Sequence, residues 1–236
     1  MTIVTSKNEC LTIIPAKGTS VGIPRKNMAL LGGRPLLEFS MKTAIGAEIP
    51  GRICLSTEDK SIRDFGLQFP IECPFLRPDN LSKDDVSVIP VINHALDWYE
   101  DNEGYKPEFI TLLQITNPFR GSETIRRAYE VMLSSDAKSL ISVNKVQHHP
   151  CEYIVPGEEK FEFVMPRPLK TGRQNFPEVL FINATLYMTR VDFFREYGRL
   201  YDGTATLFRI GTDEAFDIDE PEDLELANWI IGKKLV

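Results

Sequence analysis

Two aspartates near the carboxyl end of the chain could hold a metal ion. Asp217 and Asp219 flank Ile218, and because side chains alternate along an extended segment, both carboxylates face the same side. One or two carboxylates, completed by substrate phosphates and water, form the usual Mg²⁺ site of nucleotide-using enzymes. The simpler alternative is that Asp219 caps a helix beginning at Pro221 while Asp217 is solvated. The spacing alone leaves both interpretations open.

A second candidate site is the glycine-containing loop after the first predicted strand. Residues 11–14 have strand-like composition, and Gly18 and Gly22 then interrupt the pattern. Loops at the carboxyl ends of parallel strands are where open sheets bind ligands. Between residues 16 and 37 the charged residues are two lysines and two arginines, without one acid, although the chain has a net charge of −7. The loop is neither a dinucleotide fingerprint nor a P-loop, and a glycine with a lysine in a loop is more often a simple surface turn. The alternative is that backbone N–H groups near Gly18, together with the lysines, bind an anion.

The segment from residue 144 to residue 178 departs from the pattern of the rest of the chain. It contains five prolines and the apolar run FEFVM, which predict an inserted β-rich arm. Apolar side chains that cannot be buried locally usually pack on a partner subunit or cover a site, so we expect a homodimer formed through this arm. The charged residues between positions 163 and 177 are all basic. Individually they would be solvated surface charges, but as an acid-free group they favour binding of an anion.

The composition excludes several classes of protein. The excess of acidic residues argues against a nucleic-acid partner. No apolar run approaches the ~20 residues that a membrane span needs, and no signal peptide is evident, so a cytoplasmic enzyme is expected. The four cysteines are scattered, which indicates neither a disulfide framework nor a zinc site. Cys54 and Cys73 lie in apolar segments and are expected in the core.

Strand and helix patterns alternate along the chain, which predicts an α/β fold with parallel strands. Asp85 and Ser122 are predicted to cap the two central helices. Strands are predicted at 52–56, 71–75, 109–115, 140–143, 180–188 and 206–210, and helices at 35–47, 60–69, after 85, after 122 and at 221–231.

Several motifs, in order, resemble the CMP-sialic acid synthetase family, the acylneuraminate cytidylyltransferases. IIPAKGTSVGIPRKN at 13–27 resembles I-P-A-R-x-x-S-K-G-I-P-x-K-N, and FDIDEPEDL at 216–224 resembles I-D-I-D-x-x-x-D-L. LQITNPFR at 113–120 is similar to L-Q-P-T-S-P-L-R. Shorter matches are R-P-x-x-L-x-x-D at 77–84, H-P at 149–150, R-Q at 173–174 and the asparagine at 183. The resemblance therefore covers nearly the whole chain.

The resemblance implies a three-layer Rossmann-like nucleotidyltransferase fold for residues 1–236, with a mostly parallel sheet. Residues 144–178 would be an inserted dimerisation arm that contributes to the neighbouring subunit's active site. The implied reaction transfers CMP from CTP to the anomeric hydroxyl of a nonulosonate-type acid sugar, such as sialic or legionaminic acid, and releases pyrophosphate, with Mg²⁺ as cofactor.

The resemblance also assigns roles to the matching residues. The implied catalytic residues are Lys26, Asp217 and Asp219, and the two aspartates are the implied metal ligands. The implied nucleotide contacts are Ala16, Lys17, Gly18, Ser20, Lys26, Asn27, Arg77 and Ser87. The implied contacts of the acid sugar are Gln114, Arg167, Lys170, Arg173, Gln174 and Asn183.

The sequence departs from the family pattern at four positions. Lys17 replaces an arginine, Val21 stands where a lysine is expected, Asn117 replaces a serine and Ala184 replaces a glycine. Lysine keeps the charge of arginine but loses its bidentate geometry, whereas valine removes a phosphate contact. Three alternatives therefore stay open: an eight-carbon acid sugar as acceptor, another anionic acceptor, or a catalytically silent CTP-binding paralogue.

Overall fold

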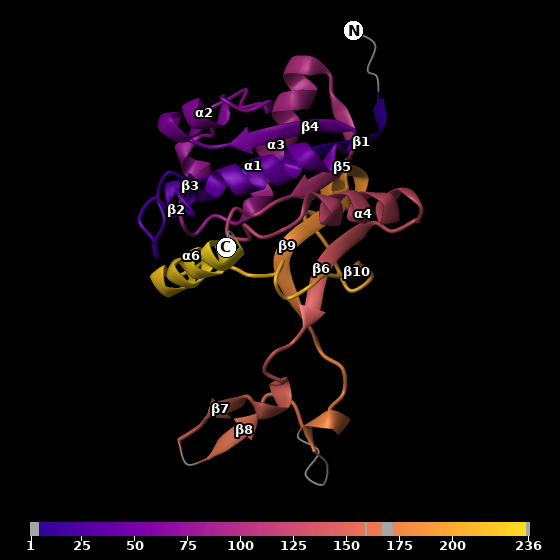
Figure 1. Ribbon diagram of the computed structural model, residues 1–236. Helices are drawn as coiled ribbons and strands as arrows, with labels where there is room; N and C mark the ends of the chain where they lie inside the picture. Colours follow the sequence, from indigo (N-terminus) through magenta and orange to yellow (C-terminus); the bar gives the residue numbers. More distant parts are fainter. Residues whose placement is uncertain (1–4, 159, 167–171, 235–236) are drawn as a thin grey trace.

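A six-stranded sheet forms the centre of the molecule (Figure 1). The computed structural model describes residues 5–158, 160–166 and 172–234. The strands are β1 (Thr5–Pro15), β4 (Gly51–Ser56), β5 (Lys106–Leu112), β6 (Ser139–Lys145), β9 (Leu180–Arg190) and β10 (Thr206–Arg209). Across the sheet they follow the order β10-β6-β9-β5-β1-β4.

Strand direction in the sheet follows from how the chain is connected. β1 is parallel to β4 and β5, and β6 is parallel to β10, as crossover connections require. β9 is antiparallel to both β5 and β6, because the chain leaves the sheet along β6, forms the arm and returns along β9. The prediction of a mostly parallel sheet is confirmed, with β9 as its antiparallel strand.

Helices cover both faces of the sheet and give the fold three layers. They are α1 (Leu36–Ala47), α2 (Lys60–Gly66), α3 (Val88–Glu103), α4 (Ser122–Leu133), α5 (Val191–Tyr197) and α6 (Pro221–Lys234). Side chains alternate along β1, so that Cys10 and Ile14 pack in one core cluster with α1, α2, α4 and α6, whereas Leu11 and Ile13 pack in a second cluster with α3 and α5. The predicted three-layer α/β fold is therefore confirmed.

Short elements complete the chain. A small hairpin is formed by β2 (Leu30–Leu31) and β3 (Arg34–Pro35), and single 3₁₀ turns are η1 (Lys26–Met28), η2 (Asp79–Leu81), η3 (Pro150–Glu152) and η4 (Arg173–Asn175). Among the described residues, no helix is both long enough and apolar enough to cross a membrane. All four cysteines are buried free thiols, which confirms the core placement of Cys54 and Cys73.

Three local predictions are wrong. Residues 71–75 form only one bridge, between Cys54 and Glu72, because Pro74 has no N–H with which to continue a ladder beside β4. The residue that precedes α3 is Ser87 rather than Asp85. Ser122 lies inside α4, and its hydroxyl donates to Thr43 O at 2.9 Å instead of capping the helix. The helix α5 was not predicted.

The arm projects away from the sheet as a separate lobe (Figure 1). Its hairpin pairs β7 (Ile154–Pro156) with β8 (Phe161–Phe163) in antiparallel register. Among the described residues of the arm, six large apolar side chains are exposed: Tyr153, Ile154, Val155, Phe161, Phe163 and Val164. The single chain therefore presents an apolar surface at a distance from its own core.

Candidate active site

The carboxyl ends of β1, β4 and β5 meet at one edge of the sheet, because these three strands are parallel. A cavity of about 810 Å³ lies at this edge. Its wall includes eight of the predicted site residues: Lys17, Ser20, Lys26, Asn27, Arg77, Ser87, Gln114 and Asp219. The structure thus brings together residues from four separated sequence motifs. Val21 also lines this cavity and is 85% exposed.

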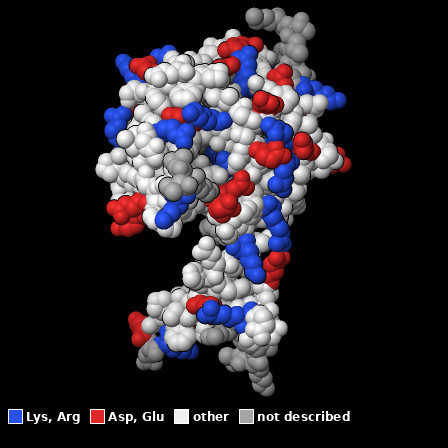
Figure 2. All heavy atoms as spheres, viewed as in Figure 1, with Lys and Arg blue, Asp and Glu red and all other residues white. Residues whose placement is uncertain are grey.

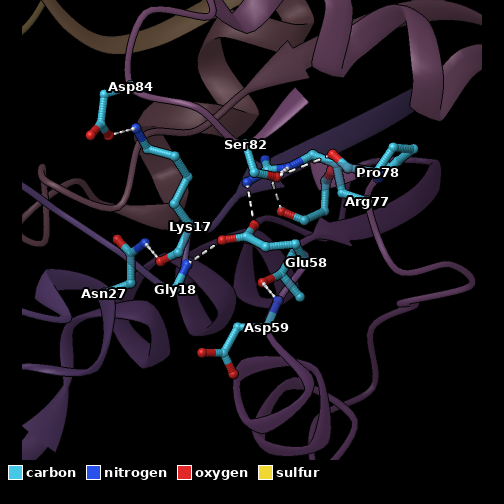
Figure 3. Close-up of polar contacts among 11 residues, drawn as sticks. Lys17, Gly18, Asn27, Glu58, Asp59, Arg77, Pro78, Ser82 and Asp84 are labelled. Carbon is cyan, nitrogen blue, oxygen red and sulfur yellow. Dashed lines mark hydrogen bonds and ion pairs between the residues drawn. The ribbon is translucent and has the colours of Figure 1, made fainter. Parts of the chain in front are cut away.

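Two predicted nucleotide contacts do not line the cavity. Ala16 is fully buried in the core, where its N–H donates to Ser56 O at 2.9 Å. The N–H of Gly18 donates to Glu58 Oε1 at 2.7 Å (Figure 3). The N–H group of Gly18, which we predicted to bind phosphate, therefore already donates to a carboxylate of the protein itself.

The loop after β1 is held in place from within and by the segment before α6. Asn27 is buried, and its Nδ2 donates to Lys17 O at 2.8 Å. A Cβ added at Gly22 would lie 2.6 Å from Asp219 O, so only glycine permits this close approach. The loop and the aspartate segment therefore form one wall of the cavity.

The lysines of the loop are paired with carboxylates from distant segments. Lys17 Nζ lies 2.7 Å from Asp84 Oδ1 (Figure 3), and Lys26 Nζ lies 2.9 Å from Asp219 Oδ1. Both pairs are partly exposed, so solvent weakens them. The two aspartates therefore hold the lysine ammonium groups at the cavity, and an anionic ligand could replace these weak ion pairs.

Glu58 is a site residue that the sequence analysis missed. It lies two residues after the end of β4, and its carboxylate accepts hydrogen bonds from Gly18 N and from Arg77 Nη2, each at 2.7 Å (Figure 3). Arg77 also donates to Ser82 Oγ at 2.9 Å and has a side chain that is 1% exposed. Arg77 therefore fastens loops together as well as lining the cavity. The available signal was the position of Glu58 at the carboxyl end of a strand beside β1.

The two aspartates have different surroundings. Asp217 is exposed at the surface, but partial desolvation of its carboxylate raises its pKa. A hydrogen bond from Thr116 opposes this shift, and the charge of the nearby Asp219 adds to it. Ile218 is fully buried, and its N–H donates to Thr116 O at 2.9 Å. Asn117 Nδ2 donates to Phe216 O at 3.2 Å. Hydrogen bonds to Thr116 and Asn117, in the loop after β5, therefore hold the segment that carries the two aspartates.

Asp219 does not act as the helix cap that the simpler interpretation requires. Its carboxylate contacts Lys26, while Asp223 Oδ2 accepts from the N–H groups of Asp219 and Glu220 at 3.0 and 2.9 Å. Asp223, on the first turn of α6, therefore ties the segment that precedes the helix to the helix start, as the third helical residue of a capping box does.

The donor set of the aspartates fits a hard cation. Within the described part of the chain, no group of three or more acidic, histidine or cysteine side chains could enclose a metal by itself. Two carboxylates with neighbouring open space suit Mg²⁺, which normally keeps water and phosphate oxygens among its ligands. Asp217 and Asp219 are the residues that could hold it.

A second cavity, of about 330 Å³, lies where the arm joins the sheet. Asp217 lines this cavity, whereas Asp219 lines the larger one. Other lining residues come from the root of the arm and from the loop after β10: Asn144, Gln147, His148, Tyr153, Phe181, Thr212 and Phe216. The aspartate segment thus separates two neighbouring cavities.

Two of the predicted arm contacts, Arg173 and Gln174, are described by the structure, and neither lines these cavities within one chain. Arg173 lies on the arm, is 79% exposed, and its Nε pairs with Glu152 Oε1 at 2.8 Å. Gln174 is exposed beside it. Arg167 and Lys170 lie outside the described residues.

Asn183 is buried behind the smaller cavity rather than open to it. Its Oδ1 accepts from Ser142 Oγ at 2.6 Å, and its Nδ2 donates to Asn144 Oδ1 at 2.9 Å. In this chain it therefore orients Asn144, which lines the cavity. The next residue, Ala184, has a φ of 56°, a conformation that glycine adopts at lower cost.

Comparison with known proteins agrees with this geometry. A family model described as cytidylyltransferase matches residues 11–234. The chain therefore belongs to the cytidylyltransferase family, and the family predicted from its motifs is confirmed.

Two relatives and one solved structure illustrate the similarity. The chain is 29% identical to the CMP-N,N'-diacetyllegionaminic acid synthase of Legionella pneumophila, over 96% of this chain and 95% of the relative. It is 27% identical to the pseudaminic acid cytidylyltransferase of Campylobacter jejuni, over 94% of each. CMP:2-keto-3-deoxy-manno-octonic acid synthetase complexed with CTP is 14% identical, with a TM-score of 0.69 over 96% of this chain and 99% of that one. This last likeness shows the shared fold.

Proposed function

We propose that the chain transfers CMP from CTP to the anomeric hydroxyl of a nonulosonate-type acid sugar and releases pyrophosphate. The observation that carries this proposal is the cavity in which the lysine-containing loop after β1 faces Asp219. Membership of the cytidylyltransferase family supports CTP as the nucleotide substrate. Relatives named for legionaminic and pseudaminic acids support a nonulosonate-type sugar as the acceptor.

The larger cavity is the place for CTP. Lys26, Ser20 and Lys17 line it together, so that two ammonium groups and a hydroxyl are available to the triphosphate. The same cavity is also lined by Ser87, Val88 and Val91, which offer an apolar surface with one hydroxyl to the nucleoside. Glu58 links Arg77 to the loop after β1, because its carboxylate accepts from both Arg77 and Gly18.

The reaction needs positioning and charge neutralisation more than a covalent nucleophile. The acceptor oxygen forms a bond to the α-phosphorus, the bond from that phosphorus to the leaving pyrophosphate breaks, and the hydroxyl proton is released to the medium. Lys26 would neutralise phosphate charge from the position that its pair with Asp219 now fixes. Gln114 lines the same cavity and would orient the acceptor.

Mg²⁺ is the proposed cofactor, held by Asp217 and Asp219. When bound, it supplies charge neutralisation for the phosphates and polarisation of the attacking oxygen. The carboxylate chemistry of the pair supports this assignment, as does the position of Asp219 in the same cavity wall as the lysine loop.

The acceptor would extend from Gln114 toward the smaller cavity, which Asp217 lines. Asn144 and Thr212 offer polar contacts there, and Tyr153 and Phe181 offer apolar ones. A sugar acid carries hydroxyl, acyl and carboxylate groups that match such a mixed surface.

A homodimer is the proposed active assembly. The exposed apolar side chains of the arm support it, since exposed apolar patches of this kind mark interaction surfaces. In such a dimer the basic residues of one arm, Arg167, Lys170 and Arg173 with Gln174, would contribute to the acid-sugar site of the neighbouring subunit.

A pyrophosphate-release screen tests the proposal. The purified chain is incubated with CTP, Mg²⁺ and a panel of nine-carbon and eight-carbon acid sugars, with ATP, GTP and UTP as nucleotide controls. We expect release with CTP and a nine-carbon acid sugar. CTP binding without release from any member of the panel would instead identify a catalytically silent paralogue.

A further inference from the structure

Arg120 is a buried arginine whose hydrogen bonds, within the described part of the chain, go to carbonyl and hydroxyl oxygens rather than to a carboxylate. It is 3% exposed, and its guanidinium donates to Thr185 O, to Ser40 Oγ at 3.0 Å and to Gln114 O at 3.3 Å. Among the described residues, its Nε has no hydrogen-bond partner. Burial lowers the pKa of Arg120 to about 9, although the charge of Glu214 opposes the shift. Burying such a charge costs stability, so stability alone does not account for its presence here.

The three acceptors of Arg120 belong to three different parts of the fold. Ser40 lies on α1, Gln114 lies in the loop that lines the larger cavity, and Thr185 lies on β9. Ser40 Oγ also donates to Gln114 O at 3.3 Å. Arg120 and Ser40 therefore hold the same backbone carbonyl from two sides.

Thr185 belongs to a bulge at the root of the arm. On β6, Ile141 pairs with Tyr187 and Val143 pairs with Ile182. A step of two residues on β6 thus corresponds to a step of five on β9, which leaves extra residues in β9 at this point. The bulge lies where the strand enters the sheet from the arm, so Arg120 joins the arm root directly to the Gln114 loop.

We propose that Arg120 is a positioning residue that fixes Gln114 relative to the arm. This inference rests on the proposed function, in which Gln114 contacts the acid sugar. A guanidinium holds two acceptors at fixed directions, whereas a lysine ammonium is a point charge on a flexible chain. Recognition of the acid sugar, rather than binding of CTP, therefore depends on Arg120.

The test compares Arg120→Lys and Arg120→Met with Arg190→Lys. Arg190 is a matched control, because it pairs with Glu108 and donates to Ala137 O and Ser135 O on the far side of the sheet. We expect Arg120→Lys to raise the KM for the acid sugar by about tenfold through misplacement of Gln114, while calorimetry gives a CTP Kd within about twofold of the parent. Arg120→Met should be more severe, and Arg190→Lys should change neither constant.

Hydrogen exchange gives a readout that does not depend on turnover. Arg120→Lys should accelerate amide exchange at 113–117 and 183–186 and leave residues 17–28 at the parental rate. Ser40→Ala, a milder change, should also accelerate exchange in these segments and raise the KM for the acid sugar. This variant provides the test if an Arg120 variant does not fold.

The outcomes separate this inference from the proposed function. A parent that releases no pyrophosphate contradicts the proposed function, and hydrogen exchange then still decides whether Arg120 holds the loop. An unchanged acid-sugar KM and exchange pattern in both Arg120→Lys and Ser40→Ala would overturn the inference. A parallel rise of both substrate constants, together with a lower melting temperature, would overturn it in favour of a structural role alone.

Discussion

Lys26 Nζ lies 2.9 Å from Asp219 Oδ1, although the two residues are 193 positions apart in the sequence. This pair joins the loop after β1 to the segment before α6 across the mouth of the larger cavity. Gly22 packs against the backbone of the same aspartate. The contact places the proposed phosphate-binding lysine beside one of the two proposed metal-binding carboxylates, and phosphoryl transfer depends on such preorganised charges.

Replacing either aspartate by asparagine should abolish most turnover. Asp217→Asn and Asp219→Asn each remove a charge and a hard oxygen ligand, so we expect kcat/KM to fall by at least about a hundredfold, or about 2.7 kcal/mol of transition-state stabilisation. Circular dichroism should show an intact fold. Glu222→Gln is the control, because Glu222 is exposed on the first turn of α6. Turnover of either aspartate variant within about threefold of the parent would exclude that residue as a metal ligand.

Glu58→Gln should destabilise the protein. Its partner Arg77 has a side chain that is only 1% exposed, and removing one member of a buried ion pair costs about 3–5 kcal/mol. Because the Glu58 side chain is 17% exposed, we expect about 3 kcal/mol in urea unfolding, toward the lower end of that range.

The control for Glu58 is the exposed pair of Glu123 and Arg126 on α4. Glu123→Gln should cost less than about 1 kcal/mol. Equal losses in the two variants would show that Glu58 does not act as a buried anchor.

Ala184→Gly should stabilise the fold. The left-handed backbone at this position, with a φ of 56°, costs an alanine about 1–2 kcal/mol, and the greater entropy of an unfolded glycine offsets part of the gain. We expect a net increase of about 0.5–1 kcal/mol in the free energy of unfolding. Ala128→Gly within α4 should have the opposite sign, since glycine weakens a helix interior. Destabilisation by Ala184→Gly would mean that the methyl group packs in a way that outweighs the backbone strain.

A mixed-dimer experiment tests whether the arm serves the neighbouring site. Arg173→Ala and Asp219→Asn should each be inactive, the first in the arm and the second in the main domain. Mixing and re-equilibrating the two variants should restore about a quarter of parental activity, because half of the dimers are mixed and each mixed dimer has one intact site.

Activity that stays at the level of the separate variants would contradict arm exchange. The double variant Phe161→Asp with Phe163→Asp is the companion measurement. It places charge on the exposed hairpin and should shift sedimentation from dimer to monomer.

Local patterns predicted much of the fold. The alternation of strands and helices predicts the layers, and the spacing of Asp217 and Asp219 predicts that Ile218 between them is a buried anchor. That both carboxylates serve one site stays a prediction, since the two line different cavities. Such inferences succeed because they depend on periodicities that the backbone imposes on neighbouring residues.

Other features depend on contacts between distant segments, which local patterns do not encode. The place of Glu58 near the carboxyl end of a strand marks it as a candidate, but local patterns do not indicate that it accepts from the N–H of Gly18, or that Asn183 lies behind Asn144. Both follow from how loops meet at the edge of the sheet. The missing strand at 71–75 has a local cause, since Pro74 ends its hydrogen bonding. The antiparallel direction of β9 follows from the arm insertion.

The most direct test of the central claim is identification of the reaction product. The chain, CTP, Mg²⁺ and the best acid sugar from the screen are followed by ³¹P NMR and mass spectrometry. We predict that the three CTP resonances are replaced by those of pyrophosphate and of a single phosphodiester, and that the new species has the mass of CMP joined to the acid sugar through its anomeric oxygen. Formation of free CMP and pyrophosphate without the sugar conjugate, or persistence of CTP with every acid sugar, would contradict the account.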